Sequence, residues 1–401
     1  MKVLVVNAGS SSLKYQLFDT DNGVVLAKGN CERIGIDGSK LIHKNEEKNI
    51  NFEKETPIEN HAEAMKLVVS ALLDSKVGCI NSVDEIEAIG HRVVHGGPYF
   101  TKSMLVTDDV MSTLEKCVSY APLHTPAHIM GIKGCQEVMP ATPQVLVFDT
   151  AFHQTMPKEA YMYAISYDMY EDYQIRRYGA HGTSHRYVSG EMCKILGKTE
   201  GTKIITCHIG NGSSISAVKD GKCIDTSMGF TPLDGIMMGT RCGAIDPAIV
   251  PFIMEKKGYT PAQMDAYMNK KCGFEGVSGV GSDSRDVEKA MFEGNERAKL
   301  TYDMLCYQIK KFIGSYSAAM GGVNAIVFTA GIGEHASYIR EHALEGLEYL
   351  GVKLDKERNT FKHSSTPVKL SSDDSAVAVY MIPTNEELVI AKDTEEIVKS
   401  I

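Results

Sequence analysis

A chain of 401 residues, 43% hydrophobic and 23% charged, has the composition of a globular protein, and its length predicts two domains rather than one. The formal net charge of −9 disfavours nucleic acid or an anionic membrane as the main partner, so an anionic substrate would need local basic groups. Ten cysteines without a C-x-x-C pair, an N-terminal apolar run of only four residues and the lack of a membrane-length apolar segment predict a cytoplasmic protein with reduced thiols.

Residues 1–29 predict three antiparallel strands. An apolar strand leads into a turn of Gly9 and three serines, a return strand follows, and Asn22-Gly23 marks a second turn before the third strand. Small turn residues let backbone amides and hydroxyls approach a tetrahedral anion, so the first turn is a candidate phosphate loop.

Residues 40–60 are charged and alternate only weakly, which predicts a solvated edge strand and a loop. Asn60 has the position of an N-cap for a helix that ends at Leu73. A short strand over 86–89 leads into GHRVVHGG, which places Arg92 at a strand end beside glycines.

The segment 121–128 precedes an expected helix that ends near Gly134. The apolar strand 144–148 then ends at Asp149. Carboxylates at strand ends of α/β domains either face a ligand cleft or cap the next turn, and the sequence leaves both alternatives open.

Residues 203–229 repeat the layout of the N-terminal segment. A β-rich run leads into a small-residue turn at 210–214, and the return strand closes on Asp220-Gly221. Two such hairpins half a chain apart predict two related domains that offer phosphate loops to a shared cleft.

Asp283-Ser284-Arg285 opens a helical stretch that runs to Gly321-Gly322, and a strand over 324–329 feeds a glycine-rich loop over 331–335. The next helix is expected near Ser337.

The last strand is expected over 377–382. Thr384 and Glu387 have the N-cap and N3 spacing of a capping box at the start of the final helix, which leaves Glu386 available for other contacts.

Two nucleotide-binding patterns are incomplete or ambiguous. Gly197-Lys198-Thr199 resembles the end of a P-loop, but the preceding glycine, Gly190, is two residues too far away. Residues 331–336 fit G-x-G-x-x-A, so a dinucleotide-binding dehydrogenase is an alternative on this segment alone, although it would not explain two phosphate hairpins.

Two histidine pairs have the H-x-x-x-H spacing of helical zinc ligands. They are His124 with His128 and His181 with His185. We expect Pro126 and Gly182 to interrupt regular helix at these places, which disfavours zinc.

Nine strings between residue 3 and about residue 391 resemble the acetokinase family, within the actin, Hsp70 and sugar-kinase superfamily. They are NAGSSSLKYQLFD, GHRVVHGG, APLHTP, VFDTAFH, RRYGAHGTSH, CHIGNGSS, TPLDGIMMGTRCGAIDP, FTAGIGEH and PTNEEL. The resemblance implies an α/β fold of two duplicated actin-like ATPase domains with ribonuclease H-like cores around a central cleft. It implies an N-terminal domain at 1–150, completed by the C-terminal helix 385–401, and a nucleotide-binding and dimerisation domain at 151–384 that forms a homodimer.

The same resemblance implies an activity. Its members transfer the γ-phosphoryl group of ATP reversibly to acetate, giving acetyl phosphate and ADP by direct in-line transfer, and a short-chain acyl kinase for propionate or butyrate is the alternative. The implied cofactor is Mg²⁺, with Mn²⁺ as a substitute, and the implied partners are a small carboxylate and ATP/ADP, not nucleic acid or a membrane. An ATP-driven clamp of the Hsp70 or actin kind is a rival from another class.

Residue roles follow from the matched strings. Asn7 and Glu386 correspond to magnesium positions, Arg92 to the site of the substrate carboxylate, and Asp149, His181 and Arg241 to the catalytic positions, with His181 and Arg241 stabilising the transition state. Residues matched to the transferred phosphate and nucleotide are Ser10, Ser12, Lys14, His208, Ile209, Gly210, Asn211, Gly212, Asp283, Ser284, Arg285, Gly331, Ile332, Gly333, Glu334 and His335.

Asp149 corresponds to the family's essential carboxylate. Acetate is already ionised near neutral pH and has no proton to remove, so we expect Asp149 to align the magnesium shell or Arg241 rather than to act as a base.

One position departs from the family pattern. Ala180 stands where the family usually carries phenylalanine, and the resemblance implies that this position lines the methyl pocket together with Val94, Leu123 and Pro232. A smaller side chain predicts a roomier pocket and weaker discrimination between acetate and longer acids.

Overall fold

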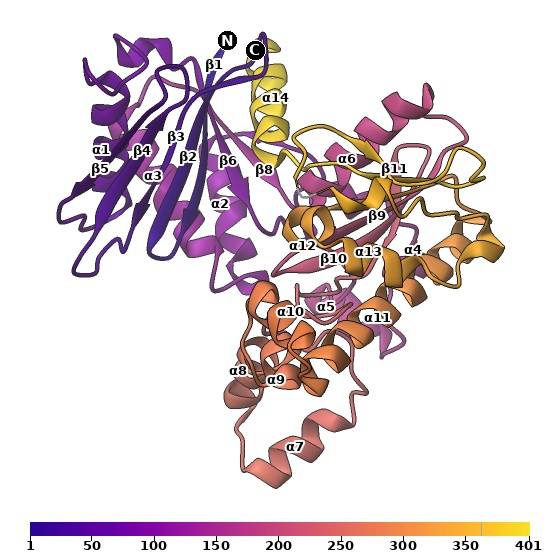
Figure 1. Ribbon diagram of the computed structural model, residues 1–401. Helices are drawn as coiled ribbons and strands as arrows, with labels where there is room; N and C mark the ends of the chain where they lie inside the picture. Colours follow the sequence, from indigo (N-terminus) through magenta and orange to yellow (C-terminus); the bar gives the residue numbers. More distant parts are fainter. Residues whose placement is uncertain (362) are drawn as a thin grey trace. The chain divides into compact units, whose positions relative to one another are not determined.

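The computed structural model describes residues 1–361 and 363–401. The chain separates into two compact units, one formed by Met1–Phe152 with Asn385–Ile401 and the other by His153–Thr384 (Figure 1). The sequence-based division at 150/151 lies two residues away, and the roles assigned to the two domains stay predictions.

The first unit is built on an eight-stranded sheet in the order β5-β4-β3-β2-β1-β6-β8-β7. The strands are β1 Lys2–Gly9, β2 Ser12–Asp19, β3 Val24–Glu32, β4 Lys40–Asn45, β5 Ile50–Glu55, β6 Ala88–Val93, β7 Met104–Leu105 and β8 Gln144–Phe148. The first five pair antiparallel in sequence order, β6 runs parallel to β1, and β8 runs parallel to β6.

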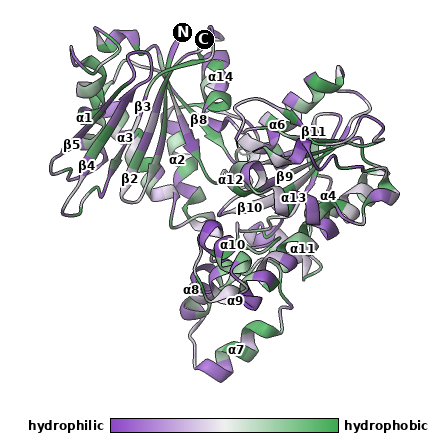
Figure 2. Ribbon diagram, viewed as in Figure 1, coloured by the Kyte–Doolittle hydropathy of each residue, from purple (hydrophilic) through white to green (hydrophobic). Residues whose placement is uncertain are grey.

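Helices cover both faces of this sheet. They are α1 His61–Leu73, α2 Asp108–Lys116, α3 Thr125–Val138 and α14 Glu386–Lys399. Alternation along β1 explains the arrangement, since Leu4 and Val6 share a core with α1 while Val3 and Val5 share one with α14. In Figure 2, α14 carries hydrophobic (green) and hydrophilic (purple) residues, as expected of a helix with one buried face.

The second unit repeats the strand arrangement of the first. Its six-stranded sheet has the order β11-β10-β9-β12-β14-β13, and its strands are β9 Lys203–Ile209, β10 Ser213–Lys219, β11 Lys222–Thr226, β12 Ala325–Thr329, β13 Val368–Lys369 and β14 Ala378–Met381. Three antiparallel strands followed by two parallel ones give the same succession as β3-β2-β1-β6-β8. The fold is therefore two duplicated α/β domains with ribonuclease H-like cores, as predicted.

The helices of the second unit are α4 Lys158–Tyr161, α5 Tyr167–Tyr173, α6 Gly182–Leu196, α7 Ile249–Lys257, α8 Pro261–Lys270, α9 Gly273–Ser278, α10 Ser284–Phe292, α11 Glu296–Met320, α12 Ala330–His335 and α13 Ser337–Leu344. The long helix α11 buries Leu305, Ile309 and Ile313 in the same core as Ile205 and Phe328 of the sheet. No helix among residues 1–361 and 363–401 is long and apolar enough to cross a membrane. All ten cysteines are free thiols.

Several local predictions were wrong in instructive ways. Residues 40–55 form two strands, β4 and the edge strand β5, because a turn at 46–49 lets the weakly alternating segment fold back on itself. Helix α3 begins at Thr125 and α6 begins at Gly182. Pro126 and Gly182 therefore lie in first turns, where proline costs no hydrogen bond, and interrupt neither helix.

The start of the final helix also differs from the prediction. Asn385, not Thr384, is the N-cap of α14 and its side chain accepts the amide of Leu388 at 3.1 Å, so the capping box with Glu387 does not form. Residues 330–335 form the short helix α12 rather than a loop.

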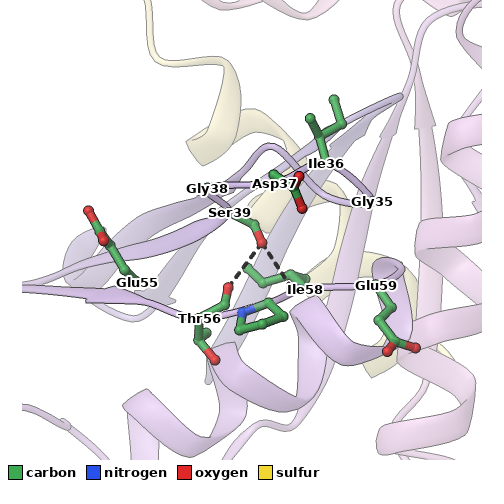
Figure 3. A pocket seen from close by; sticks show the side chains of 10 residues that line it. Gly35, Ile36, Asp37, Gly38, Ser39, Glu55, Thr56, Ile58 and Glu59 are labelled. Atoms are coloured by element: carbon green, nitrogen blue, oxygen red, sulfur yellow. Dashed lines mark hydrogen bonds between the residues drawn. The ribbon is translucent and has the colours of Figure 1, made fainter.

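A shallow cavity of about 540 Å³ lies at the β4–β5 edge of the first unit (Figure 3). The Ser39 hydroxyl donates to the carbonyl of Thr56 and accepts the amide of Ile58, each at 3.0 Å. None of the predicted site residues lines this cavity.

Candidate active site

In the first unit, Arg92 and Asp149 form a buried ion pair. They lie at the ends of the neighbouring parallel strands β6 and β8. Nε and Nη2 of Arg92 donate to Oδ2 of Asp149 at 3.1 and 2.7 Å, and the side chains are 26% and 1% exposed. The nearby carboxylate raises the pKa of Arg92 despite burial. Asp149 thus fixes the plane of the guanidinium, whereas the sequence predicted that it would align Arg241 or a magnesium shell.

The residues predicted around this pair differ in exposure. Val94 is half-buried and donates its amide to Nε2 of His128 at 3.3 Å, whereas Leu123 is 74% exposed. Burial, and then the charge of Arg92, lower the pKa of His128 to about 4, so this imidazole is neutral at pH 7.

The predicted metal residues lie near the first hairpin and the start of α14. Asn7 on β1 pairs with Lys14 on β2, and both line a cavity of about 390 Å³ together with Glu387. Glu386 is the first residue of α14 and, like Glu387, raises the pKa of Arg92. Amide and carboxylate oxygens fit a hard divalent cation that keeps part of its water shell.

The turn of the first hairpin is tight. Ser10 is exposed, and a Cβ at Gly9 would lie 2.8 Å from the hydroxyl oxygen of Ser12. The exposed Ser10 and the half-buried Ser12 thus lie at the turn that the sequence predicts to face phosphate.

In the second unit, His181 and Arg241 converge on the turn of the second hairpin. A Cβ at Gly212 would lie 3.5 Å from Nε2 of His181 and 3.7 Å from Nη1 of Arg241. His181 is the N-cap of α6 and has a left-handed backbone with φ of 59°, a conformation that costs a non-glycine residue roughly 1 kcal/mol or more. Its ring stacks on His208 with centroids 4.1 Å apart.

Arg241 is a half-buried cation. Nη1 donates to the carbonyl of Pro232 at 3.2 Å, and Arg241 forms no ion pair with any residue in the described part of the chain. Burial lowers its pKa. A desolvated guanidinium without a carboxylate partner is a strong site for an anion such as a phosphoryl group.

Three segments predicted to contact the nucleotide line one cavity of about 270 Å³. It is lined by Gly210, Asn211, Gly239, Phe274, Ser282, Asp283, Ser284 and Ile332. The chains approach closely here, since a Cβ at Gly210 would lie 3.6 Å from Cβ of Ala330 and one at Gly239 only 2.0 Å from Oδ1 of Asn211. The second hairpin, the start of α10 and α12 are thereby brought together.

Other residues of the three segments do not line this cavity but are buried or form hydrogen bonds within the second unit. Ile209 is fully buried in the sheet core. Glu334 accepts the amides of Ala330 and Thr384 at 3.0 and 3.2 Å. A Cβ added at Gly331 would meet no atom within 4 Å, and Nδ1 of His335 donates to the carbonyl of Gly331 at 2.9 Å.

Arg285 points away from the core of the unit. Its side chain is 86% exposed and donates to Asp283, and this contact, with the Arg285 amide, lowers the pKa of Asp283 to about 2. Gly333 is a buried residue of α12.

Ala180 is packed rather than open. It is 4% exposed and forms a small cluster with Met228 and Met238. The space that a phenylalanine would occupy at this position is thus bounded by two methionines.

Sequence reasoning missed a hydrogen-bonded set of residues behind His181. Ser214 Oγ lies 2.8 Å from Nδ1 of His181 and 2.7 Å from Nε2 of His185. The H-x-x-x-H spacing was a real signal of a shared helix face, but the shared partner is a hydroxyl. Among the residues that the structure describes, no group of three or more His, Cys, Asp or Glu is arranged to hold a metal.

The repeated cores define a duplicated actin-like α/β protein. Comparison with known proteins shows to which family the chain belongs. The model of the acetokinase family matches residues 2–392. An acetate kinase of Caldanaerobacter subterraneus subsp. tengcongensis is 57% identical over 403 residues and covers 100% of both chains.

Solved structures agree with this relationship. The crystal structure of Porphyromonas gingivalis acetate kinase has a TM-score of 0.96 at 46% identity and covers 99% of each chain. A propionate kinase from Francisella tularensis subsp. tularensis SCHU S4 has a TM-score of 0.91 at 41% identity, covering 98% of this chain and 99% of its own. The chain belongs to the acetokinase family.

Proposed function

We propose that this protein transfers the γ-phosphoryl group of ATP reversibly to acetate, giving acetyl phosphate and ADP. The observation that carries the proposal is the convergence of Nε2 of His181 and Nη1 of Arg241 on Gly212, close in sequence to the cavity residues Gly210 and Asn211. Full-length similarity to acetate kinases supports acetate as the acceptor.

The nucleotide is assigned to the second unit. A Cβ added at Gly331 would meet no atom within 4 Å, which leaves room for a flat base, and Asp283 and Ser284 at the start of α10 line the cavity at Gly210 and Asn211. Ile332 supplies an apolar surface for the base.

The carboxylate is assigned to Arg92 in the first unit. Asp149 holds Nε and Nη2 of this guanidinium, and Nη1 donates to no residue in the described part of the chain. The remaining N–H groups can hold a substrate carboxylate. Val94, Leu123 and Pro232 are proposed to contact its methyl group.

The chemical step is a direct in-line displacement. A carboxylate oxygen of acetate forms a bond to the γ-phosphorus while the bond between that phosphorus and the β–γ bridging oxygen breaks, and ADP leaves with the electron pair. No proton is transferred, so Asp149 acts by positioning Arg92. His181 and Arg241 stabilise the charge on the equatorial oxygens.

Mg²⁺ is proposed as the metal, with Mn²⁺ as a substitute. Asn7 and Glu386 would hold it in the first unit through oxygen ligands, and Ser10, Ser12 and Lys14 would face the phosphates. The metal neutralises phosphate charge when bound.

We propose acetate rather than a longer acid as the substrate. A short-chain acyl kinase is the alternative, because the chain is similar to a propionate kinase and carries Ala180. Met228 and Met238 pack on Ala180 and reduce the extra space. One methylene in an apolar pocket is worth about 1–3 kcal/mol. We therefore expect kcat/KM for acetate to exceed that for butyrate at least tenfold, and equal values would favour the alternative.

We further propose a cytoplasmic homodimer that associates through the second unit. Reduced thiols and family membership support this assignment. Sedimentation velocity of the full chain tests it, with a single species of twice the chain mass expected.

The test of the proposed function is trapping of the product. The protein is incubated with ATP, Mg²⁺ and acetate in the presence of hydroxylamine, which converts an acyl phosphate to a coloured hydroxamate. Hydroxamate formed only with acetate, in step with ADP, supports the proposal. ADP released equally without any carboxylate, and no hydroxamate, would contradict it and favour the ATP-driven clamp.

A further inference from the structure

In the second unit, a series of hydrogen bonds between buried polar side chains links His181 to Thr206. Nδ1 of His181 lies 2.8 Å from Oγ of Ser214, which lies 2.7 Å from Nε2 of His185. Nδ1 of His185 lies 2.7 Å from Oγ1 of Thr206, whose hydroxyl donates to the carbonyl of Ser216 at 3.5 Å. His185, Thr206 and Ser214 are each 0% exposed, so water does not compete for these contacts.

The direction of each hydrogen bond follows from its far end. A backbone carbonyl only accepts, so the Thr206 hydroxyl gives its proton to Ser216 and its oxygen accepts from Nδ1–H of His185. His185 is neutral, because burial, and then His153 and His208, lower its pKa well below the ordinary value.

A neutral imidazole that donates from Nδ1 has a bare Nε2. Nε2 of His185 therefore accepts the Ser214 hydroxyl proton, and the Ser214 oxygen is left to accept from Nδ1–H of His181. Each of the three hydrogen bonds between His181 and Thr206 then has one donor and one acceptor.

We infer that Ser214, His185 and Thr206 position His181 by fixing Nδ1 as a hydrogen-bond donor and turning Nε2 toward Gly212. The inference rests on the proposed role of His181 in phosphoryl transfer. It also explains how a side chain on a left-handed residue keeps one orientation, since the ring is held at Nδ1 by Ser214 and on its face by His208.

These hydrogen bonds predict that a substitution at Thr206 changes which ring nitrogen of His181 carries the proton, although Thr206 is three hydrogen bonds away. Thr206→Val keeps the shape but removes the acceptor for Nδ1 of His185. His185 then protonates Nε2 and donates to Ser214, whose hydroxyl turns toward His181. Nδ1 of His181 becomes an acceptor. Thr206→Ser keeps the hydroxyl and leaves the direction unchanged.

The experiment is ¹⁵N NMR of the ligand-free full chain with ¹⁵N-labelled histidine, with His181 assigned by the resonances lost in His181→Gln. We expect a protonated Nδ1 in the unmodified protein and in Thr206→Ser, and an unprotonated Nδ1 in Thr206→Val. A protonated Nδ1 in all three would overturn the inference. Because no substrate is present, this result stands apart from the proposed function, which fails separately if the unmodified protein forms no hydroxamate.

Ser214→Ala provides a second arm if Thr206→Val does not fold. We expect kcat to fall at least tenfold while KM for ATP and for acetate changes less than threefold, since His181 loses its orientation but the binding groups remain. An unchanged kcat in a folded Ser214→Ala protein would contradict the positioning role.

Discussion

At the scale of single residues, the pair of Arg92 and Asp149 determines how the carboxylate would be held. The two side chains share hydrogen bonds at 2.7 and 3.1 Å, and Asp149 is almost completely buried. A carboxylate in this position is already committed to a guanidinium, which is a poor arrangement for a general base but a good one for orienting a binding group.

Asp149→Asn tests this positioning role. We expect kcat/KM for acetate to fall by 100-fold or more, because the amide is uncharged and replaces one of the two oxygens that accept from Nε with an NH2 donor, so Arg92 loses its fixed plane. Initial rates in H₂O and D₂O measure the second consequence, a solvent isotope effect near unity in both proteins. A large effect in the unmodified protein that disappears in the variant would restore the general base.

The sequence suggested residue roles only where a matched string carried them. Arg241, His181 and the turn at 210–212 were proposed in this way, because glycine and arginine strings are local in the chain. The partnership of Arg92 with Asp149 was not predicted, since it depends on the parallel register of β6 and β8 across 57 residues.

At the scale of elements, the second hairpin is held against its neighbours by contacts that leave no room for a side chain. Gly239 lies so close to Asn211 that a Cβ would come within 2.0 Å of Oδ1 and 3.1 Å of the carbonyl of Ser282. The hairpin turn and the cavity wall are therefore coupled.

Gly239→Ala should displace the Asn211 side chain and raise KM for ATP at least fivefold, with a smaller change in KM for acetate. Isothermal titration with ADP measures the binding effect directly. Gly190→Ala is the matched control, because its Cβ would meet no atom within 4 Å. Equal ADP affinity in both variants would remove the cavity at 210–211 from the nucleotide site.

The stability of the first unit depends on pH through the buried His91 of strand β6. Nε2 of the buried His91 lies 2.7 Å from Oε1 of Gln144, and burial lowers the pKa of His91 to about 4. Between pH 6.5 and 4 the unfolded chain binds a proton that the folded unit does not, so the free energy of unfolding falls as pH falls. From pH 7 to pH 5 we expect His91 to account for a loss of about 2 kcal/mol.

Hydrogen exchange of the β6 amides at pH 7 and pH 5 measures this loss without requiring two-state unfolding of the whole chain. His91→Gln, which cannot be protonated, should show a smaller pH dependence, to which His128 and His43 still contribute because burial lowers their pKa values as well. A pH dependence identical to that of the unmodified protein would contradict the assignment.

At the scale of the whole molecule, the chain returns to its first unit after completing the second. Ile390 of α14 is 1% exposed and shares a core with Val3, Val5 and Val145 of the sheet. The first unit is therefore complete only when the last residues of the chain have been added.

Ile390→Ala should destabilise the first unit by about 2–5 kcal/mol through loss of buried area and a residual cavity. In scanning calorimetry we expect the unfolding transition of the first unit to move to a lower temperature and the transition of the second unit to stay unchanged. Glu396→Ala, on the exposed side of α14, is the control. Equal shifts in both transitions would mean that α14 does not act on the first unit alone.

The duplicated fold could be predicted because each hairpin carries its own turn signals, at Asn22-Gly23 and Asp220-Gly221. Helices α7 to α9 were not predicted, although Thr260 and Gln263 form a capping box at the start of α8 and Pro261 is its first residue. The capping of α14 was also missed, since Thr384 and Asn385 both suit an N-cap and the choice depends on the contact of Thr384 with Glu334.

The most direct test of the account is kcat for hydroxamate formation from ATP and acetate in Arg241→Ala. Removing one preorganised transition-state donor should lower kcat by about 100- to 1,000-fold, while KM for acetate changes little because Arg92 binds the carboxylate. Circular dichroism confirms that the variant is folded. A kcat within threefold of that of the unmodified protein would contradict the proposal that phosphoryl transfer takes place beside Arg241.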